Sequence, residues 1–200
     1  MYENKIKIYQ QQDEEKFPSP DINLFVGSSS IRRWETLAKD MLPKLALNRG
    51  FGGSDMKTLL LLYDSFILPY KFSKIFIYEG DNDLSGKHSH PQNVLDLFVK
   101  IEEKIQKQCP EAQINFISIK FSPARRAFWG KFKTANVLFK NYCESKSYLN
   151  FIDITTSMQN NEGEANTLLF NEKDRIHPNN AGYKILTSIL KPYLYPSEYD

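Results

Sequence analysis

The sequence has few of the features that mark specialised classes of protein. It contains two cysteines, Cys109 and Cys143, whose separation fits neither a metal-binding nor a redox motif, so we expect reduced thiols. No stretch approaches the roughly 18 consecutive apolar residues that a membrane-spanning helix requires. The first ten residues lack the apolar segment of a signal peptide. We therefore expect a cytoplasmic protein with no membrane span.

The sequence also has no strong excess of positive or negative charge. The 26 basic and 24 acidic residues leave a formal net charge of +2, which is too small to indicate a polyanion as partner, so we expect no nucleic-acid binding. Two of the three histidines, His88 and His90, share a loop that has no third metal ligand nearby. The sequence thus predicts neither a metal nor a cofactor, and nothing in it specifies an oligomeric state.

The length of 200 residues, 41% of them hydrophobic, fits one domain with a sizeable core. Residues 1–20 are predicted to form an N-terminal arm, because Pro18 and Pro20 interrupt regular structure at its end. The domain itself is expected to cover residues 21–195.

Short apolar runs alternate with amphipathic stretches along this domain. Buried strands are predicted at 22–26, 44–47, 74–78, 113–119 and 149–152, and helices at 94–108, 135–145 and 180–193. This alternation is typical of an α/β fold. We predict a three-layer α/β/α sandwich around a five-stranded parallel sheet with the flavodoxin-like strand order. In such sheets ligands bind at the carboxyl ends of the strands.

The first predicted strand is followed by Gly27-Ser28-Ser29-Ser30-Ile31. A serine run at a strand-to-helix junction suits an anion site or a nucleophilic hydroxyl. The commoner role is an ordinary helix N-cap. The residue pattern alone leaves these readings open.

Two further polar motifs follow the second and third predicted strands. The first, 48–55, contains Gly50, Gly52 and Gly53, which allow a close approach of backbone N–H groups to a ligand. The second, 79–83, contains Asn82, whose amide can donate to a developing oxyanion. Both also have the composition of plain turns.

A fourth motif, Asp174-Arg175-Ile176-His177, precedes the last predicted helix. Residues three apart on a helical turn share a face, so Asp174 can reach Nδ1 of His177 and leave Nε2 free to accept a serine proton. The alternative is that Asp174 caps the last helix and His177 lies on the surface.

Together, from about residue 22 to 193, these four motifs resemble the signature blocks of the SGNH hydrolase superfamily, the GDSL-like lipases and acylhydrolases. The resemblance implies Ser29 as nucleophile and Asp174 and His177 as the rest of a triad. It also implies an oxyanion hole formed by the backbone N–H groups of Ser29 and Gly53 and by the Asn82 amide. Gly-Ser-Ser-Ser-Ile-Arg-x-Trp is similar to a bacterial branch of the family. Ser28 stands where the family usually has aspartate, so Ser28 and Ser30 are not excluded as nucleophile by the pattern.

The resemblance implies a serine esterase whose partner is a small-molecule acyl ester. A carbohydrate deacetylase, a thioesterase and a lysophospholipase are alternatives within that class. Candidates for the lining of a substrate pocket are Phe128, Trp129, Leu168, Leu169 and Phe170, although core packing explains them equally well.

Two rival functions belong to other classes. One is a non-catalytic ligand-binding module on the same fold, against which the three intact triad residues argue. The other is a single-strand nucleic-acid binder that uses basic residues interleaved with aromatic ones. These residues are Lys120, Arg125, Arg126, Lys131 and Lys133 among Phe121, Phe128, Trp129 and Phe132. The near balance of acidic and basic residues argues against this second rival.

Overall fold

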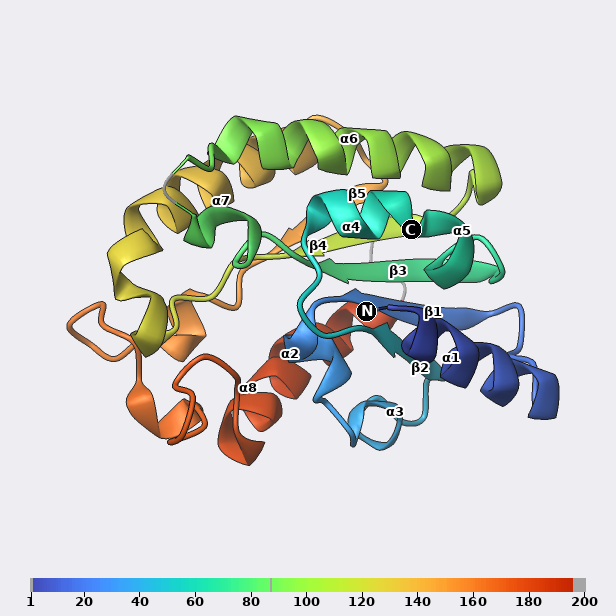
Figure 1. Cartoon of the computed structure of the whole chain (residues 1–200), viewed down its shortest axis with the longest axis horizontal. Helices are drawn as coiled ribbons and strands as arrows, with labels where there is room; N and C mark the ends of the chain where they lie inside the picture. The colour runs from blue at the N-terminus through green and yellow to red at the C-terminus, as the bar shows by residue number, and fades with distance from the viewer. Residues whose placement is uncertain (1, 87, 196–200) are drawn as a thin grey trace.

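A parallel sheet of five strands lies between two layers of helices in the computed structural model, which describes residues 2–86 and 88–195 (Figure 1). The strand order is β2-β1-β3-β4-β5, and every neighbouring pair is parallel. This is the predicted flavodoxin-like order, and it brings the ends of β1, β2 and β3 side by side at one edge.

Five predicted apolar runs correspond to the five strands. The bounds are β1 Ile22–Gly27, β2 Ala46–Gly50, β3 Phe72–Tyr78, β4 Gln113–Ile117 and β5 Leu149–Ile152. β2 lies later in the chain than predicted: it begins at Ala46 instead of residue 44, and Arg49 and Gly50 pair in register with the end of β1. The motif expected to follow this strand therefore begins inside it. β4 ends earlier than predicted, because the backbone N–H and C=O of Ile119 bond to the side chain of Asn136.

The helices are α1 Glu3–Glu15, α2 Ser29–Arg32, α3 Leu37–Asp40, α4 Met56–Leu61, α5 Tyr63–Phe66, α6 Pro91–Gln108, α7 Trp129–Glu144 and α8 Asn180–Leu190. The predicted helix at 94–108 begins earlier, at Pro91, because proline suits the first position of a helix. α8 ends before the predicted residue 193, and a 3₁₀ turn with Pro192 continues the chain as Lys191–Leu194. Within the described residues, no helix combines the length and apolarity needed to cross a membrane.

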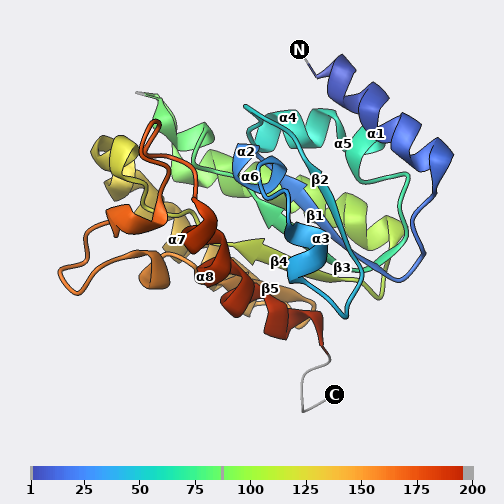
Figure 2. The same cartoon turned by 90° about the horizontal axis from the view of Figure 1, so that it is seen from below.

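The sheet is buried on both faces, so side chains that alternate along a strand enter two different cores. Leu24 and Val26 of β1 pack in the core shared with α4, α6 and α7. Phe25 points the other way, where it stacks on Phe76 with ring centroids 4.3 Å apart and joins the core beneath α2, α3 and α8. Figures 1 and 2 show these two helical layers on opposite faces of the sheet.

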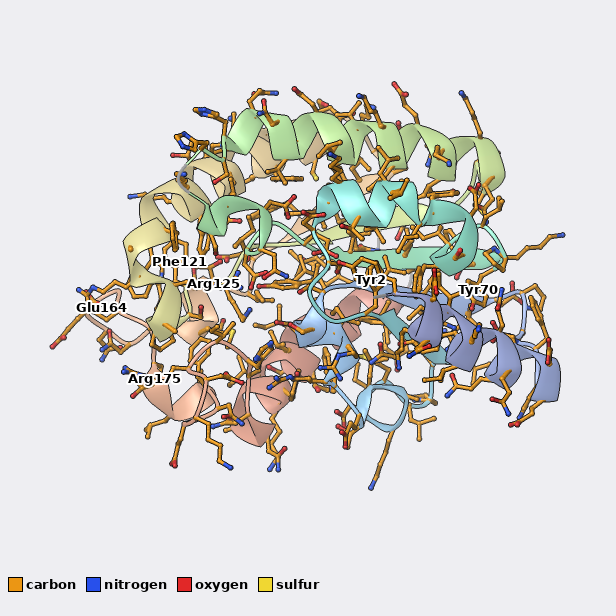
Figure 3. The ribbon with its side chains drawn as sticks, in the orientation of Figure 1. Tyr2, Tyr70, Phe121, Arg125, Glu164 and Arg175 are labelled. Carbon is orange, nitrogen blue, oxygen red and sulfur yellow. The ribbon has the colours of Figure 1, made fainter. Side chains whose placement is uncertain are left out.

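The expected N-terminal arm contains a 13-residue helix, α1, which packs against the sheet edge formed by β2. Tyr9 is buried, and its hydroxyl donates to the carbonyl of Gly50 at 2.6 Å. Asp13 pairs with Arg49 and accepts a hydrogen bond from Tyr70, which is labelled in Figure 3. The prolines that marked the arm stand after this helix, where they do not interrupt it.

Candidate active site

Ser29 is placed by a sharp turn at the end of β1. Gly27 has a φ of 134°, and a Cβ there would lie 2.1 Å from the carbonyl oxygen of Tyr78, so glycine is required. The chain then passes Ser28 and enters α2, of which Ser29 is the first residue.

The structure distinguishes the three consecutive serines. Ser28 and Ser30 are only 1% and 4% exposed, whereas Ser29 is half-buried. The Oγ of Ser29 lies 2.6 Å from Nε2 of His177. Ser30 instead accepts a hydrogen bond from Lys120. Ser29 is thus the serine of the run that is both accessible and in contact with a base.

Asp174 and His177 are also joined directly. Oδ2 of Asp174 lies 2.9 Å from Nδ1 of His177, and Oδ1 accepts the backbone N–H groups of Ile176 and His177 at 2.9 and 3.0 Å. The predicted helical turn is wrong: the segment is a loop in which Arg175 has a φ of 52°. The carboxylate itself closes this loop and brings the two side chains together.

The alternative role for Asp174, as cap of the last helix, is also wrong. Asn179 is the N-cap of α8, and its side-chain oxygen accepts the N–H of Gly182 at 3.0 Å.

Arg33 is a member of this cluster that the sequence analysis missed. Its Nη1 donates to Oδ2 of Asp174 at 2.8 Å, so one carboxylate oxygen faces both Arg33 and His177. The two residues are 141 positions apart, and no local pattern signals such a contact.

These contacts control the charge state of the cluster. Partial burial opposes ionisation of Asp174, but the N–H groups of His177 and Ile176 outweigh it and hold the pKa of Asp174 well below its ordinary value. For His177, burial lowers the pKa, with smaller contributions from the charges of Arg33 and Lys120, while Asp174 opposes this change. The imidazole is therefore neutral at pH 7 and can accept a proton.

The two predicted oxyanion residues lie in the loops that follow the carboxyl ends of β2 and β3. Gly53 has a φ of 75°, and its carbonyl accepts the hydroxyl of Tyr2, at the start of α1 (Figure 3), at 3.2 Å. Nδ2 of Asn82 donates to the carbonyl of Ser54 at 2.7 Å, and Oδ1 accepts from Arg125 at 2.6 Å. The Asn82 amide, with two N–H donors, keeps one for a ligand.

Within the described part of the chain, neither Gly53 nor Asn82 forms a direct hydrogen bond with Ser29. Among the same residues, the backbone N–H groups of Ser29 and Gly53 donate to no protein acceptor. Two backbone donors and one amide donor thus remain available near the end of the sheet.

Below this loop lies a buried acid. The hydroxyl of Ser54 donates to Oε1 of Glu79 at 2.5 Å, and Glu79 is fully buried. Burial raises the pKa of Glu79 well above its ordinary value, while the hydrogen bond from Ser54 opposes this shift.

Lys120, one of the basic residues that the rival nucleic-acid-binding function would use, is not accessible to a ligand. Its side chain is 0% exposed, and Phe132 from the same run belongs to the core. Two members of the proposed nucleic-acid-binding run are therefore inaccessible, which counts against that rival function. Among the described residues, no three His, Cys, Asp or Glu side chains are grouped so as to hold a metal ion.

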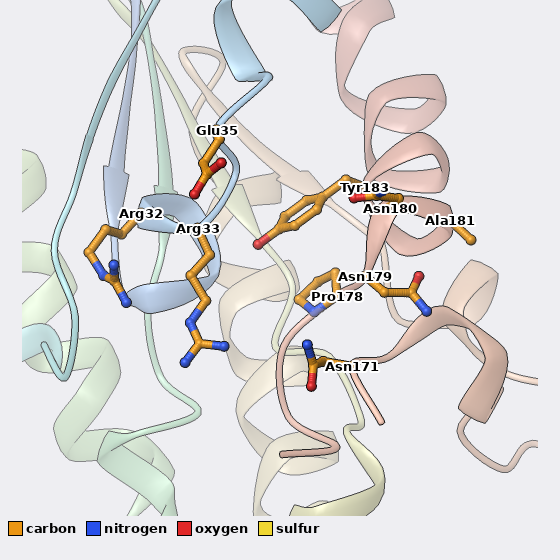
Figure 4. A pocket seen from close by; sticks show the side chains of 9 residues that line it. All are labelled: Arg32, Arg33, Glu35, Asn171, Pro178, Asn179, Asn180, Ala181 and Tyr183. Carbon is orange, nitrogen blue, oxygen red and sulfur yellow. The ribbon is translucent and has the colours of Figure 1, made fainter. Parts of the chain in front are cut away.

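Two open pockets border the loop that carries Asp174 and His177. One, of about 810 Å³, has Arg32 and Arg33 on one side and Asn171 and Asn179 on the other (Figure 4).

The other pocket, of about 650 Å³, includes Trp129 and Leu168 together with Asn160, Asn166 and Arg175. Trp129 and Leu168 were predicted to line a pocket, whereas Leu169 and Phe170 are buried in the core. Polar side chains thus dominate both surfaces beside the candidate triad.

No protein-family model matches the chain, and no curated protein matches it. Several solved structures do match the chain. A candidate platelet activating factor from Streptococcus pneumoniae is 23% identical, with a TM-score of 0.85 over 96% of this chain and 92% of that one. A GDSL-like lipase from Bacteroides thetaiotaomicron is 18% identical, with a TM-score of 0.76 over 94% and 96%.

A carbohydrate esterase of family 3 from Talaromyces cellulolyticus is 11% identical, with a TM-score of 0.69 over 86% of this chain and 96% of that one. The chain therefore has the α/β fold that GDSL-like lipases and acylhydrolases share, as the SGNH resemblance implied.

Proposed function

We propose that the protein is a serine esterase of the SGNH type that hydrolyses short acyl esters. The observation that carries the proposal is the unbroken contact chain from Ser29 Oγ to His177 Nε2, 2.6 Å, and from His177 Nδ1 to Asp174, 2.9 Å. Nucleophile, base and orienting acid stand in the order that acyl transfer requires. The names of the structural neighbours, among them a lipase and a carbohydrate esterase, support ester hydrolysis in general.

In the first half of the proposed reaction, neutral His177 removes the hydroxyl proton of Ser29 as Oγ attacks the ester carbonyl. Asp174 holds the Nδ1–H tautomer and stabilises the imidazolium that forms. The N–H groups of Ser29 and Gly53 and the Asn82 amide donate hydrogen bonds to the carbonyl oxygen and stabilise the negative charge that develops on it. Nε2–H of His177 then protonates the leaving alcohol, and an acyl-enzyme remains.

In the second half, a water molecule loses its proton to Nε2 of His177 and attacks the acyl-enzyme. The same donors stabilise the second oxyanion. Its collapse breaks the bond to Ser29 Oγ, which regains a proton from His177. The products are one alcohol and one carboxylic acid, and the enzyme returns to its starting state.

The surroundings of the triad favour a polar carrier for the acyl group. Both neighbouring pockets are lined mainly by arginine, asparagine and acidic side chains. An acetylated sugar fits such surfaces better than a long-chain lipid does, because polar groups that bind a lipid tail would lose their hydration without replacement.

The test is a comparison of wild-type protein with Ser29→Ala and Ser28→Ala. We expect the wild type to hydrolyse p-nitrophenyl acetate and acetylated sugars and to be labelled by a fluorophosphonate. Ser29→Ala should lose both properties and Ser28→Ala should keep labelling. An acetylated sugar that binds the wild type without turnover or labelling would instead establish the non-catalytic binding module.

A further inference from the structure

Lys120 follows β4 and is buried among the ends of the central strands. Its Nζ lies 3.0 Å from Ser30 Oγ, 2.8 Å from the hydroxyl of Tyr78 and 2.9 Å from Oδ2 of Asp81. An ammonium group has three N–H donors and no acceptor, so these three contacts satisfy it completely. The side chains of Lys120 and Asp81 are 0% and 4% exposed, which makes this a buried ion pair.

The position of this pair matters more than its burial. Ser30 follows the candidate nucleophile in the chain, and Asp81 precedes the candidate oxyanion donor Asn82. Lys120 therefore connects the turn that carries Ser29 to the turn that carries Asn82, two residues that share no direct hydrogen bond among the described contacts.

A second cation completes the connection on the Asn82 side. Nη1 of Arg125 lies 3.6 Å from Oδ1 of Asp81, and its Nη2 donates to Oδ1 of Asn82 at 2.6 Å. Because Oδ1 is held by Arg125, the N–H donors of the Asn82 amide face away from that contact. A continuous set of charged and polar contacts thus runs from Ser30 through Lys120, Asp81 and Arg125 to Asn82.

We propose that Lys120 is a positioning residue that sets the distance between the Ser29 turn and the Asn82 amide. This inference rests on the proposed esterase function and adds a residue to it. Lys120 forms no direct contact with Ser29 or His177. Its charge acts on His177 from a distance, and its positioning role is exerted through Ser30 and Asp81. A buried charge pair suits this role, because separating the two charges in a low-dielectric interior is costly and the pair therefore keeps one geometry. Two backbone turns with only apolar packing between them would have more freedom to shift.

Ser30→Ala is the sharpest test. It removes the contact of Lys120 with the nucleophile turn and leaves the ion pair with Asp81 intact. A misplacement of about 1 Å can cost up to about 10²-fold in rate. We expect kcat to fall about 10- to 100-fold with KM within about twofold of the wild type. Affinity for a boronic acid, which mimics the tetrahedral adduct of Ser29, should fall by a similar factor.

Ser118→Ala provides the matched control. Ser118 is also fully buried, but its hydroxyl bonds to Thr155 at 2.8 Å and not to Ser30, Lys120 or Asp81. Both variants should lower the melting temperature, but only Ser30→Ala should lower kcat. A Ser30→Ala protein with kcat within about twofold of the wild type would overturn the inference.

A second comparison separates positioning from mere stability. Lys120→Met leaves Asp81 buried without its main partner and is expected to melt far below the wild type or not to fold. Lys120→Met with Asp81→Asn removes both charges, so we expect stability to recover while kcat stays low. Recovery of kcat together with stability in the double variant would overturn the inference. If the double variant does not fold, the kcat of Ser30→Ala decides whether the inference holds.

These outcomes are distinct from failure of the proposed function. A wild-type protein that neither hydrolyses esters nor reacts with a fluorophosphonate refutes the esterase. An active wild type with an unaffected Ser30→Ala variant refutes only the role of Lys120.

Discussion

Asp174→Asn replaces one carboxylate oxygen with an amide nitrogen at the contact that orients His177. The amide oxygen can still accept the backbone N–H groups that Oδ1 of Asp174 accepts now, so the loop keeps its closure. The amide nitrogen then faces Nδ1 of His177 and donates to it. The imidazole proton moves to Nε2, which faces Ser29 as a donor and can no longer accept its proton.

The expected loss of activity is large and the expected loss of stability is small. A triad histidine held in the wrong tautomer lowers kcat about 10⁴-fold, or about 5.5 kcal/mol in the barrier. Stability loses chiefly the contact with Arg33, whose side chain is 41% exposed, and exposed ion pairs contribute about 0–1 kcal/mol.

The assay measures kcat on p-nitrophenyl acetate and the melting temperature of each protein. Asp153→Asn is the matched control, because Asp153 also closes a turn by accepting the N–H of Thr155 at 2.8 Å, outside the candidate site. We expect the control to keep full turnover. If Asp174→Asn retains more than about a tenth of wild-type kcat, Asp174 does not orient the base and the reasoning fails.

Three further predictions follow from neighbouring contacts. Asn82→Ala removes one oxyanion donor, so it should lower kcat about 10²- to 10³-fold with a similar KM in steady-state kinetics. A loss of less than about tenfold would contradict the role of Asn82 as an oxyanion donor. Arg33→Met removes a positive charge that lowers the pKa of His177, so the acid limb of the kcat/KM profile should move to higher pH; an unmoved limb refutes this coupling. Burial raises the pKa of Asp83 to about 6, from 3.8 in the unfolded chain. The folded state thus binds the proton more tightly, and the free energy of unfolding should fall by up to about 3 kcal/mol as pH rises through this interval. Asp83→Asn should remove that slope in urea titrations, and an unchanged slope would show that another group causes it.

The local sequence determined the elements of the sheet and the contact between Asp174 and His177. Short apolar runs predicted all five strands because a strand buried on both faces must be apolar nearly throughout. Asp174 and His177 are three residues apart, so the chain between them limits their distance whatever the rest of the molecule does. Even here the pattern predicted a helical turn, while the carboxylate closes a loop around Arg175.

The N-terminal segment shows where local pattern was insufficient. α1 carries weakly amphipathic sequence and follows no strand, so the prolines after it suggested only an arm. Tyr9 and Asp13 find their partners at Gly50, Arg49 and Tyr70, which lie tens of residues away. Tertiary packing of this kind supplies most of the stability of a helix in a protein, and propensity alone does not reveal it.

The tertiary structure alone decided which serine meets the base and what supports it. Ser28, Ser29 and Ser30 are the same residue type, so the sequence does not distinguish them. In the folded chain Ser28 and Ser30 are buried at the start of α2, and Ser29 stays accessible. Lys120 lies 90 residues from Ser30 and resembles any surface lysine until the sheet buries it beside Asp81. A sequence determines which residue types are present and how near neighbours are spaced. Burial and pairing across the sheet arise only when the whole chain has folded, because water and distant side chains then determine which charges are solvated and which are paired.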